Sequence, residues 1–500
     1  MASEKQPAHV PDILDTISNL SSDEVFTPPD VANALLDLLP ASIWSEPDNK
    51  FLDPACKTGV FLREIARRLM VGLEGSFPDE AERREHIFRN MVYGLAITEL
   101  TGLMSRRSLY YSKDASSKHS VVKFQDKNGN VDYKKTEHQY KNGKCAICGS
   151  PEGLLDRGEG MENYAYQFIH EESITDMKFD VIVGNPPYQI QDGGFGASAS
   201  PIYQLFVNQA FRLKPRYVSM IIPSRWFAGG KGLDAFREQM LASTNFRYLA
   251  DFPAAADLFP TVEIKGGICY FLWDSTYDGP CTIRTYKGNE VASESERFLG
   301  EHGDIFIRWS EALPILQKVQ DKYSEFVDEQ VAPSKPFGLR TFFKDYNETP
   351  SKGQIALYGN GGKYFIDRSQ VLINDAWIDK YKVLTSNGYN GGDALPHQIL
   401  GTPILAEPGS ACTETYIVCG VFDGETEARN FERYMRTKFF RFLVALRKNT
   451  QHVTQGKFKF VPKLDMSKTW TDEELYREFD LSAEEIDFIS SIVREMPLQD

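Results

Sequence analysis

The sequence predicts an α/β protein in which a doubly wound parallel sheet is followed by a second, mixed α+β domain. Apolar runs of strand length alternate with amphipathic stretches of helix length up to about residue 275. From about residue 280 this alternation gives way to short mixed segments, glycine-rich loops and a closing pair of helices. We therefore expect a first domain at residues 1–278 and a second at residues 279–500.

Each element of the first domain follows from its local pattern. Residues 25–39 read as a turn and an amphipathic helix, because their leucines recur at helical spacing. Residues 112–165 interrupt the alternation with Lys, Asn, Gly and Asp, and we interpret them as an inserted loop module. Strands are expected at 50–53, 90–97, 179–184, 217–222, 247–252 and 267–273, and helices at 60–73, 98–109, 201–213 and 231–242.

Composition describes a water-soluble chain of 500 residues, with 42% hydrophobic and 25% charged residues. The start of the chain is polar and lacks the apolar segment of a secretory signal, and no apolar run is long enough to span a membrane. Seven dispersed cysteines, an odd number, fit a reduced compartment better than a disulfide framework. We expect a cytoplasmic protein without a membrane partner.

The charge is unevenly distributed along the chain. The net charge is −14, which argues against a protein that coats nucleic acid over its whole surface. Residues 331–470 contain 19 Lys and Arg against 13 Asp and Glu, whereas residues 471–500 contain 2 against 10. One basic surface could therefore contact DNA, although mixed solvated faces would give the same counts.

A strand that reads as buried, residues 179–184, ends in Asn185-Pro186-Pro187-Tyr188. The two prolines fix their own φ and hold the residue before each of them out of the helical region. The Asn185 side-chain oxygen and the Pro186 carbonyl are thus held as two acceptors, with the Tyr188 ring beside them. This arrangement suits a planar base with an exocyclic amino group.

A loop of mostly small residues, 53–59, lies between the first strand and the helix at 60–73. Its sequence is Asp-Pro-Ala-Cys-Lys-Thr-Gly. Such a strand–loop–helix lets backbone N–H groups and a helix N-terminus approach a ligand, although an ordinary connection looks the same.

Three motifs in a fixed order resemble the gamma-class, TaqI-like DNA adenine-N6 methyltransferases of restriction–modification systems. They are Phe-Thr-Pro-Pro at 26–29, Asp-Pro-Ala-Cys-x-Thr-Gly at 53–59 and Asn-Pro-Pro-Tyr at 185–188. The resemblance implies a Rossmann-like methyltransferase domain that binds S-adenosylmethionine, followed by a DNA target-recognition domain. It further implies that an adenine flipped out of double-stranded DNA is methylated at its 6-amino group, and that a cognate restriction nuclease or helicase subunit is a possible partner.

The resemblance also assigns roles to individual residues. For catalysis it implies Asn185, Pro186, Tyr188 and Phe259, and for cofactor binding Phe26, Thr27, Pro28, Asp53, Ala55, Gly59 and Asn185. Phe259 lies in a Leu-Phe-Pro segment before a late strand, where the family places an aromatic on the other face of the base. A buried core phenylalanine is an equal alternative for Phe259.

Three departures from the family pattern concern the cofactor. Lys57 stands where the family has Gly, so either the loop avoids positive φ there or Lys57 covers the cofactor. Ala96 stands near the position of the acid that binds the ribose hydroxyls, and Thr98 or Glu99 is the expected substitute. The Asp of an Asp-Phe pair is missing before the third motif, which leaves Phe168 to contact the adenine moiety of the cofactor.

The inserted module contains Cys145-Ala-Ile-Cys148-Gly, which is half of a zinc knuckle. His138 is the expected third ligand of a structural zinc, with His119 or His170 as the fourth. Two unrelated cysteines in a loop are an equal alternative.

A segment after the apolar run 439–446 mixes cations and amides, which can contact phosphates and read base edges. It resembles part of the target-recognition region of these methyltransferases, whereas a solvated helix end is the plain alternative. The expected DNA contacts are Lys448, Asn449, Gln451 and Lys457.

Three rival functions remain. Asp251 with Glu263-Ile-Lys265 loosely matches the acid…Glu-x-Lys pattern of metal-dependent restriction nucleases. Lys57 and Ala96 would also fit a non-catalytic DNA-recognition subunit whose cofactor site has decayed. A protein or RNA N-methyltransferase also uses Asn-Pro-Pro-Tyr, but a second half of over 200 residues favours a large substrate such as duplex DNA.

Overall fold

The computed structural model describes residues 25–152, 166–170, 177–190, 200–260, 262, 264–301, 303–389, 395–448 and 452–496. The chain forms two compact units, Met1–Asp304 and Ile305–Asp500. The boundary therefore lies 26 residues later than the 278/279 division that the sequence predicted. The reason is that two further strands, β12 (Cys281–Lys287) and β13 (Glu290–Arg297), extend the sheet of the first unit instead of opening the second.

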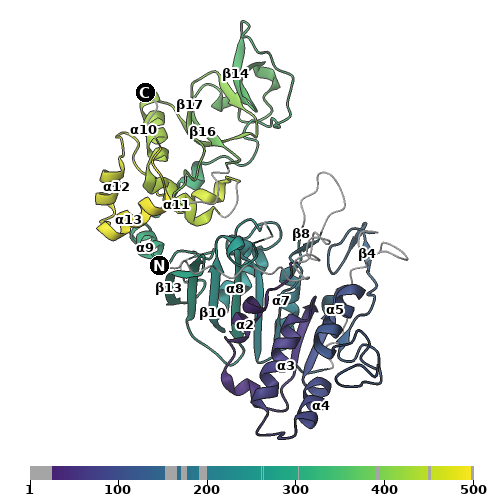
Figure 1. The fold of residues 1–500 in the computed structure, drawn as a ribbon. Coiled ribbons are helices and arrows are strands. Elements are labelled where there is room, and N and C mark those ends of the chain that lie inside the picture. Colours follow the sequence, from purple (N-terminus) through teal and green to yellow (C-terminus); the bar gives the residue numbers. More distant parts are fainter. Residues whose placement is uncertain are drawn as a thin grey trace, which may run out of the picture. The chain divides into compact units, whose positions relative to one another are not determined.

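The first unit is built on a nine-stranded sheet with the order β13-β12-β10-β11-β9-β6-β1-β2-β3 (Figure 1). Its strands are β1 (Phe51–Cys56), β2 (Val92–Ala96), β3 (Val131–Asp132), β6 (Val181–Gly184), β9 (Tyr217–Pro223), β10 (Phe246–Phe252), β11 (Ile268–Asp274), β12 (Cys281–Lys287) and β13 (Glu290–Arg297). The five neighbours from β3 to β9 are all parallel. Strand β11 is inserted antiparallel between β9 and β10, and β13 is antiparallel to β12. The predicted parallel sheet is thus confirmed for its central part and is mixed beyond β9.

Helices cover this sheet, whose central strands are mostly apolar. Every residue of β1, β6 and β9 is buried, as expected of parallel strands covered on both faces. The helices of the first unit are α2 (Pro29–Leu36), α3 (Val60–Gly72), α4 (Glu80–Asn90), α5 (Glu99–Tyr110), α6 (Gln167–His170), α7 (Tyr203–Arg212) and α8 (Asp234–Ala242). Two short hairpins, β4 (Tyr140–Lys141) with β5 (Lys144–Cys145) and β7 (Gln189–Ile190) with β8 (Ser200–Pro201), lie outside the large sheet.

The helix starts in this unit follow from local chemistry. Helix α2 begins with a proline after Pro28, at a position where the missing N–H has no helical partner to lose. Helix α5 begins with a capping box in which the side chains of Thr98 and Thr101 bond each other's backbone N–H. Gly59 precedes α3 with φ 75°, a left-handed conformation that glycine adopts at little cost.

The second unit contains two three-stranded sheets, ordered β15-β14-β18 and β17-β16-β19. Its strands are β14 (Gln354–Gly359), β15 (Gly362–Asp367), β16 (Tyr381–Ser386), β17 (Ile404–Ala406), β18 (Ser410–Cys412) and β19 (Tyr416–Phe422). Its helices are α9 (Ala312–Lys322), α10 (Glu425–Arg436), α11 (Lys438–Arg447), α12 (Asp472–Glu478) and α13 (Ala483–Ile492). The expected mixed α+β composition and the closing helix pair are both present. Among all described residues, no helix has the length and apolar character that crossing a membrane requires.

Candidate active site

The candidate site lies where β1 and β6 end as parallel neighbours in the sheet. The chain runs from β1 outward to β2 and β3 and returns through β6 to β9 on the other side, so the strand order reverses between β1 and β6. Open α/β sheets bind ligands outside the carboxyl ends of strands at such a point. The two strands also approach closely, because a Cβ added at Gly184 of β6 would lie 2.8 Å from Oδ1 of Asp53 in β1.

The Asn185 carboxamide is held at this point by the first motif. Its Nδ2 donates to the Val25 carbonyl at 3.1 Å and to Thr27 Oγ1 at 3.1 Å. The side chain is only 3% exposed, and its Oδ1 has no hydrogen-bond partner among the described residues. Two acceptors fix the amino end of the carboxamide, so its oxygen must be the free end. A buried acceptor without a partner is costly in a folded protein unless a ligand supplies the donor.

Tyr188 lies beside this oxygen with its hydroxyl buried and its ring half-buried. Burial raises the pKa of Tyr188 well above 10, and the nearby Asn185 amide offsets this only in part. The phenol is therefore neutral at physiological pH and does not act as a base. Its ring packs against the edge of the hydrophobic core, and part of the ring surface stays exposed. An exposed aromatic face of this kind can stack on a planar ligand.

Lys57 connects the second motif to the first. Its Nζ donates to the Val25 carbonyl at 2.9 Å, the same oxygen that accepts from Asn185. Its backbone φ is not positive, so the loop avoids the conformation that a glycine would serve. The sequence did not reveal this contact, because the acceptor is a backbone carbonyl and no residue type marks it.

Asp53 is buried within β1, and its Oδ1 accepts a hydrogen bond from the Ala55 N–H at 3.1 Å. Burial raises the pKa of Asp53 to about 7, although the Ala55 N–H and the charge of Lys57 oppose the shift. The folded pKa is thus above the value of 3.8 for a solvated Asp. Ionisation consequently opposes folding, with no penalty below about pH 4 and the full penalty above about pH 7.

We expect Asp53→Asn to stabilise the first unit at alkaline pH and not at acid pH. The variant keeps an acceptor for the Ala55 N–H and removes the buried charge, which opposes folding by up to about 4 kcal/mol above pH 7. Denaturant unfolding of wild type and variant without cofactor, at pH 4 and pH 8.5, measures the difference. An equal difference in unfolding free energy at both pH values would contradict this account.

Thr98 and Glu99, the two residues expected to replace the missing ribose-binding acid, differ in burial and hydrogen bonding. Thr98 is fully buried and its hydroxyl accepts the Thr101 N–H in the α5 capping box, so it is already used by the fold. Glu99 is exposed at the first turn of α5, directly after β2. Its carboxylate therefore stays the better match to the acid that is missing at Ala96.

The two remaining aromatic residues of the expected site are both buried. Phe168 is 1% exposed and stacks on Phe206 of α7 with ring centroids 5.8 Å apart. Phe259 is 3% exposed and belongs to the hydrophobic core of the first unit. Core packing covers the Phe259 ring in this structure, as the core alternative expects, and its contact with the base stays a prediction. The roles of both phenylalanines were predicted from their positions in the sequence. Sequence position does not distinguish a ring that faces a ligand from a ring that packs in the core.

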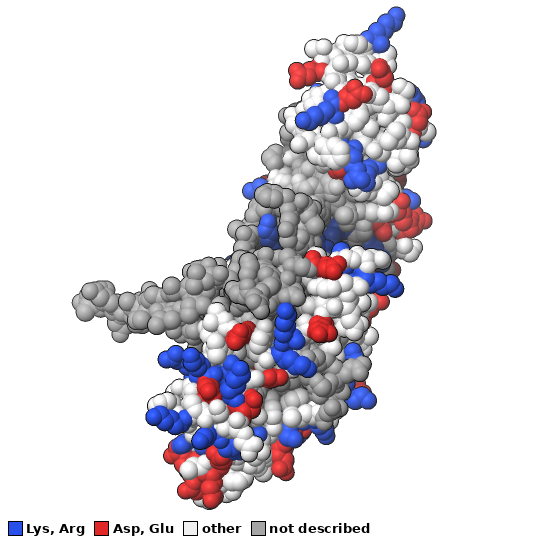
Figure 2. All heavy atoms as spheres, turned by 90° about the vertical axis from the view of Figure 1, so that its right-hand side faces the viewer, with Lys and Arg blue, Asp and Glu red and all other residues white. Residues whose placement is uncertain are grey.

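The residues expected to contact DNA are only partly within the described chain. Asn449 and Gln451 lie outside the described residues. Lys448 is half-buried and donates to the Tyr389 carbonyl at 3.2 Å, and burial lowers its pKa to about 8. Lys457 donates to the Arg447 carbonyl at 2.7 Å and so holds the C-terminal end of α11. On the face drawn in Figure 2, basic and acidic side chains are interspersed among the described residues.

Each of the two cysteines of the insert lies close to a histidine that was an expected zinc ligand. Cys148 Sγ lies 3.5 Å from His138 Nδ1, and Cys145 Sγ lies 3.8 Å from His170 Nε2. The four ligand atoms lie within 4.8 Å of one another. His170, and not the exposed His119, is thus the fourth member of this cluster.

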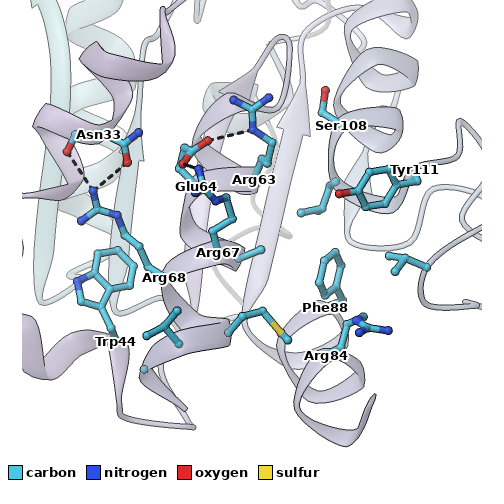
Figure 3. A pocket seen from close by; sticks show the side chains of 16 residues that line it. Asn33, Trp44, Arg63, Glu64, Arg67, Arg68, Arg84, Phe88, Ser108 and Tyr111 are labelled. Carbon is cyan, nitrogen blue, oxygen red and sulfur yellow. Dashed lines mark hydrogen bonds and ion pairs between the residues drawn. The ribbon is translucent and has the colours of Figure 1, made fainter. Parts of the chain in front are cut away.

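A pocket on the outer side of α3, α4 and α5 is separate from this site (Figure 3). None of its lining residues belongs to the loops 53–59 or 185–188. Its arginines are paired within the unit: Arg63 and Arg67 with Glu64 at 3.0 and 2.9 Å, and Arg68 with Asp37 at 2.6 Å. Each of these three arginines is therefore already paired with a carboxylate, which disfavours an anionic ligand in this pocket.

The residues of the nuclease alternative do not form a described metal site. Asp251 is fully buried in β10 and accepts a hydrogen bond from Ser224 Oγ at 2.9 Å. Glu263 lies outside the described residues.

Comparison with known proteins identifies the family. Residues 90–259 match the family model of the Eco57I restriction-modification methylase. Among solved structures, the methyltransferase subunit of a type I restriction-modification system from Streptococcus thermophilus aligns with a TM-score of 0.35 at 12% identity, covering 56% of this chain and 53% of that chain. The type IIL restriction-modification enzyme MmeI, solved in complex with DNA, aligns with a TM-score of 0.46 at 12% identity, covering 85% and 62%. This chain thus spans less than two thirds of the length of either solved protein.

A curated relative carries the assignment. It is a protein of Mycoplasma pneumoniae described as an uncharacterized adenine-specific methylase, and it is 38% identical over 320 residues. The alignment covers 57% of this chain and 76% of the relative. The chain belongs to the family of adenine-specific methylases.

Proposed function

We propose that the chain is a site-specific DNA methyltransferase that transfers a methyl group from S-adenosylmethionine to the 6-amino group of an adenine flipped out of double-stranded DNA. Within a cell it would serve as the modification component of a restriction–modification or phage-defence system. Family membership and the match to a restriction-modification methylase model support this proposal. The observation that carries it is the buried, unpartnered Oδ1 of Asn185 at the carboxyl edge of the sheet.

Two acceptors at this position would change the reactivity of an amino group. The lone pair of an exocyclic amino group is delocalised into the ring, which makes the nitrogen a poor nucleophile. The Asn185 oxygen and the Pro186 carbonyl would accept its two N–H bonds and stabilise the positive charge that builds up on the nitrogen during transfer. This is positioning and electrostatic stabilisation, and it requires neither a covalent enzyme intermediate nor a general base, because the proton can leave after transfer.

The residues around the site fit a cofactor with a charged methionine end and a ribose. S-adenosylmethionine would supply an electrophilic methyl group on a sulfonium. Phe26, Thr27 and Pro28 would close over the methionine end, while the loop residues Asp53, Ala55 and Gly59 and the first turn of α3 would cradle it. Glu99 would accept hydrogen bonds from the ribose hydroxyls, and Phe168 is the proposed neighbour of the cofactor adenine. The orphaned Asn185 oxygen is the structural sign that the crevice is built for a donor.

The adenine would have to leave the duplex to reach Asn185. Unstacking requires a few kcal/mol, which stacking on the Tyr188 ring would partly offset. For Phe259 to contribute the second face, its segment would have to move out of the core. We assign the second unit to DNA target recognition, with Lys448, Asn449, Gln451 and Lys457 as proposed contacts. A cognate restriction nuclease or helicase subunit is the proposed protein partner.

Methyl transfer to defined DNA tests this proposal. The purified chain is incubated with S-adenosylmethionine carrying a labelled methyl group and with plasmid DNA, and the nucleosides are then separated by mass spectrometry. We expect the label in N6-methyladenine, and long-read sequencing of DNA from expressing cells would give the recognition sequence. Label in a cytosine derivative, or in RNA or protein alone, would refute the proposed substrate.

The alternative of a decayed cofactor site is tested separately. Lys57 and Ala96 depart from the family pattern, but the Lys57 side chain supports the first motif through the Val25 carbonyl. We therefore expect a measurable heat of binding when S-adenosylmethionine is titrated into the chain. The absence of heat, together with retained DNA binding, would favour a non-catalytic recognition subunit.

A structural zinc is proposed as a second component, on the basis of Cys145, Cys148 and His138. It would take no part in methyl transfer, because none of these three residues belongs to the segments 53–59 or 185–188.

A further inference from the structure

We infer that His138, Cys145, Cys148 and His170 form a four-coordinate zinc site that fastens α6 and thereby builds one wall of the proposed cofactor pocket. The inference has two steps, the metal site itself and its effect on α6. The first step is independent of the proposed function. The second rests on it, because Phe168 of α6 is proposed to contact the cofactor.

The distances in the cluster match those of a tetrahedral zinc site. Zn–S and Zn–N bonds of about 2.3 and 2.0–2.1 Å place a sulfur and a nitrogen ligand about 3.6 Å apart at a tetrahedral angle. The observed separations are 3.5 Å between Cys148 Sγ and His138 Nδ1 and 3.8 Å between Cys145 Sγ and His170 Nε2. All four ligand atoms lie within 4.8 Å of one another, so one ion could contact all four. Two cysteines and two histidines are a common ligand set for structural zinc.

The backbone around the cysteines is shaped to present both thiols to one point. Strands β4 and β5 form a hairpin whose turn residues, Asn142 and Gly143, have φ values of 53° and 74°, as a primed turn requires. After Cys145 the chain folds back, so that the Gly149 N–H donates to the Cys145 carbonyl at 2.9 Å. Gly149 itself adopts φ 74°. Unrelated loop cysteines would need no such turn, and this geometry favours the ligand interpretation over the chance one.

The inserted module has little else to hold it. Among its described residues between 111 and 152, the buried apolar side chains are few, and two of them are the cysteines themselves. A segment with so small a core needs a staple, which a metal can provide by closing a loop across distant residues. His138 and His170 are 32 positions apart in the sequence, so an ion between them would join the hairpin to α6.

Helix α6 is the element that this staple would hold. It is a single turn, Gln167–His170, and an isolated turn is unstable in water. It is fastened by Gln167 Nε2, which donates to Asp132 Oδ2 of β3 at 3.1 Å, and by Phe168 stacked on Phe206. His170, at the other end of the turn, would be fastened by the metal. Losing the metal would free that end and allow Phe168 to leave its position.

Metal analysis of the full-length chain tests the first step. We expect one zinc per chain by inductively coupled plasma mass spectrometry, and a tetrahedral cobalt–thiolate absorption after replacement of zinc by cobalt(II). Cys145→Ser, Cys148→Ser and His170→Ala should lose the metal, whereas His170→Cys should retain it and His119→Ala, the matched control in the same module, should be unaffected. A metal-free wild-type chain that stays metal-free when refolded with zinc would overturn the site.

Titration with S-adenosylmethionine tests the second step. We take α6 to be in place about a tenth of the time once the metal is lost. The apparent Kd of His170→Ala for S-adenosylmethionine then rises about tenfold. The variants His170→Cys and His119→Ala should bind the cofactor like wild type. Stripping zinc from the wild type with a chelator should give the same tenfold rise, which separates the effect from misfolding of a variant. Unchanged affinity after zinc loss would overturn the coupling and leave the metal site standing. A zinc-loaded chain that never binds S-adenosylmethionine would refute the proposed function and with it the coupling, but not the metal site.

Discussion

Asn185→Ala is expected to reduce methyl transfer by at least about 10³-fold while S-adenosylmethionine binding stays within a few-fold of wild type. Removing one hydrogen-bonding group that stabilises developing charge typically lowers kcat by about 10²–10³-fold. Here the same side chain also aims the amino group, and its own position is fixed by Val25 and Thr27. The loss should appear in kcat in single-turnover assays.

A buried asparagine outside the site provides the control for this experiment. Asn49 is 8% exposed and its Nδ2 donates to the Ile43 carbonyl at 3.0 Å, ahead of β1 and away from the β1–β6 crevice. Asn49→Ala should lower stability and leave kcat near wild type. Near-normal turnover by Asn185→Ala would show that the carboxamide oxygen is not the acceptor, and the assigned role would have to be abandoned.

Tyr188→Ala is expected to lower kcat/KM for duplex DNA by roughly 10- to 100-fold, whereas Tyr188→Phe should stay within about threefold of wild type. Stacking of a base on an aromatic ring contributes about 1–3 kcal/mol, and alanine removes it while phenylalanine keeps it. Burial raises the pKa of the Tyr188 hydroxyl, so the phenol stays protonated and we expect the reaction not to use it as a base.

The two tyrosine variants distinguish stacking from acid–base chemistry. The measurement is single-turnover methylation of one duplex that contains the recognition sequence, over a range of DNA concentrations. A phenylalanine variant as impaired as the alanine variant would mean that the hydroxyl takes part. A wild-type rate for Tyr188→Ala would mean that the ring does not hold the base.

The central sheet and the position of the site could be predicted because they depend on local patterns. The largely apolar runs of β6 and β9 mark strands covered on both faces, and Asn185 directly follows β6. The domain boundary could not be predicted, because β12 and β13 resemble an ordinary hairpin until they pair with β10. Sheet extension is a tertiary event that leaves no local signal.

Residue types predicted the members of the site better than their contacts. His170 and His119 were equal ligand candidates, and only folding brought His170 to Cys145. Helix capping uses the Thr98 hydroxyl and the core covers the Phe259 ring, and neither contact could be predicted from the position of the residue in the sequence. The hydrogen bond from Lys57 to the Val25 carbonyl has a backbone acceptor, which no sequence motif can specify.

The structure of the chain with a duplex containing its recognition sequence and a non-reactive analogue of S-adenosylmethionine tests the central claim most directly. We expect one adenine outside the helix, with its 6-amino nitrogen about 3 Å from both the Asn185 Oδ1 and the Pro186 carbonyl oxygen. The same amino nitrogen should face the position of the transferable methyl group. An extrahelical adenine bound elsewhere, or an Asn185 oxygen that bonds only to protein in the complex, would contradict the account.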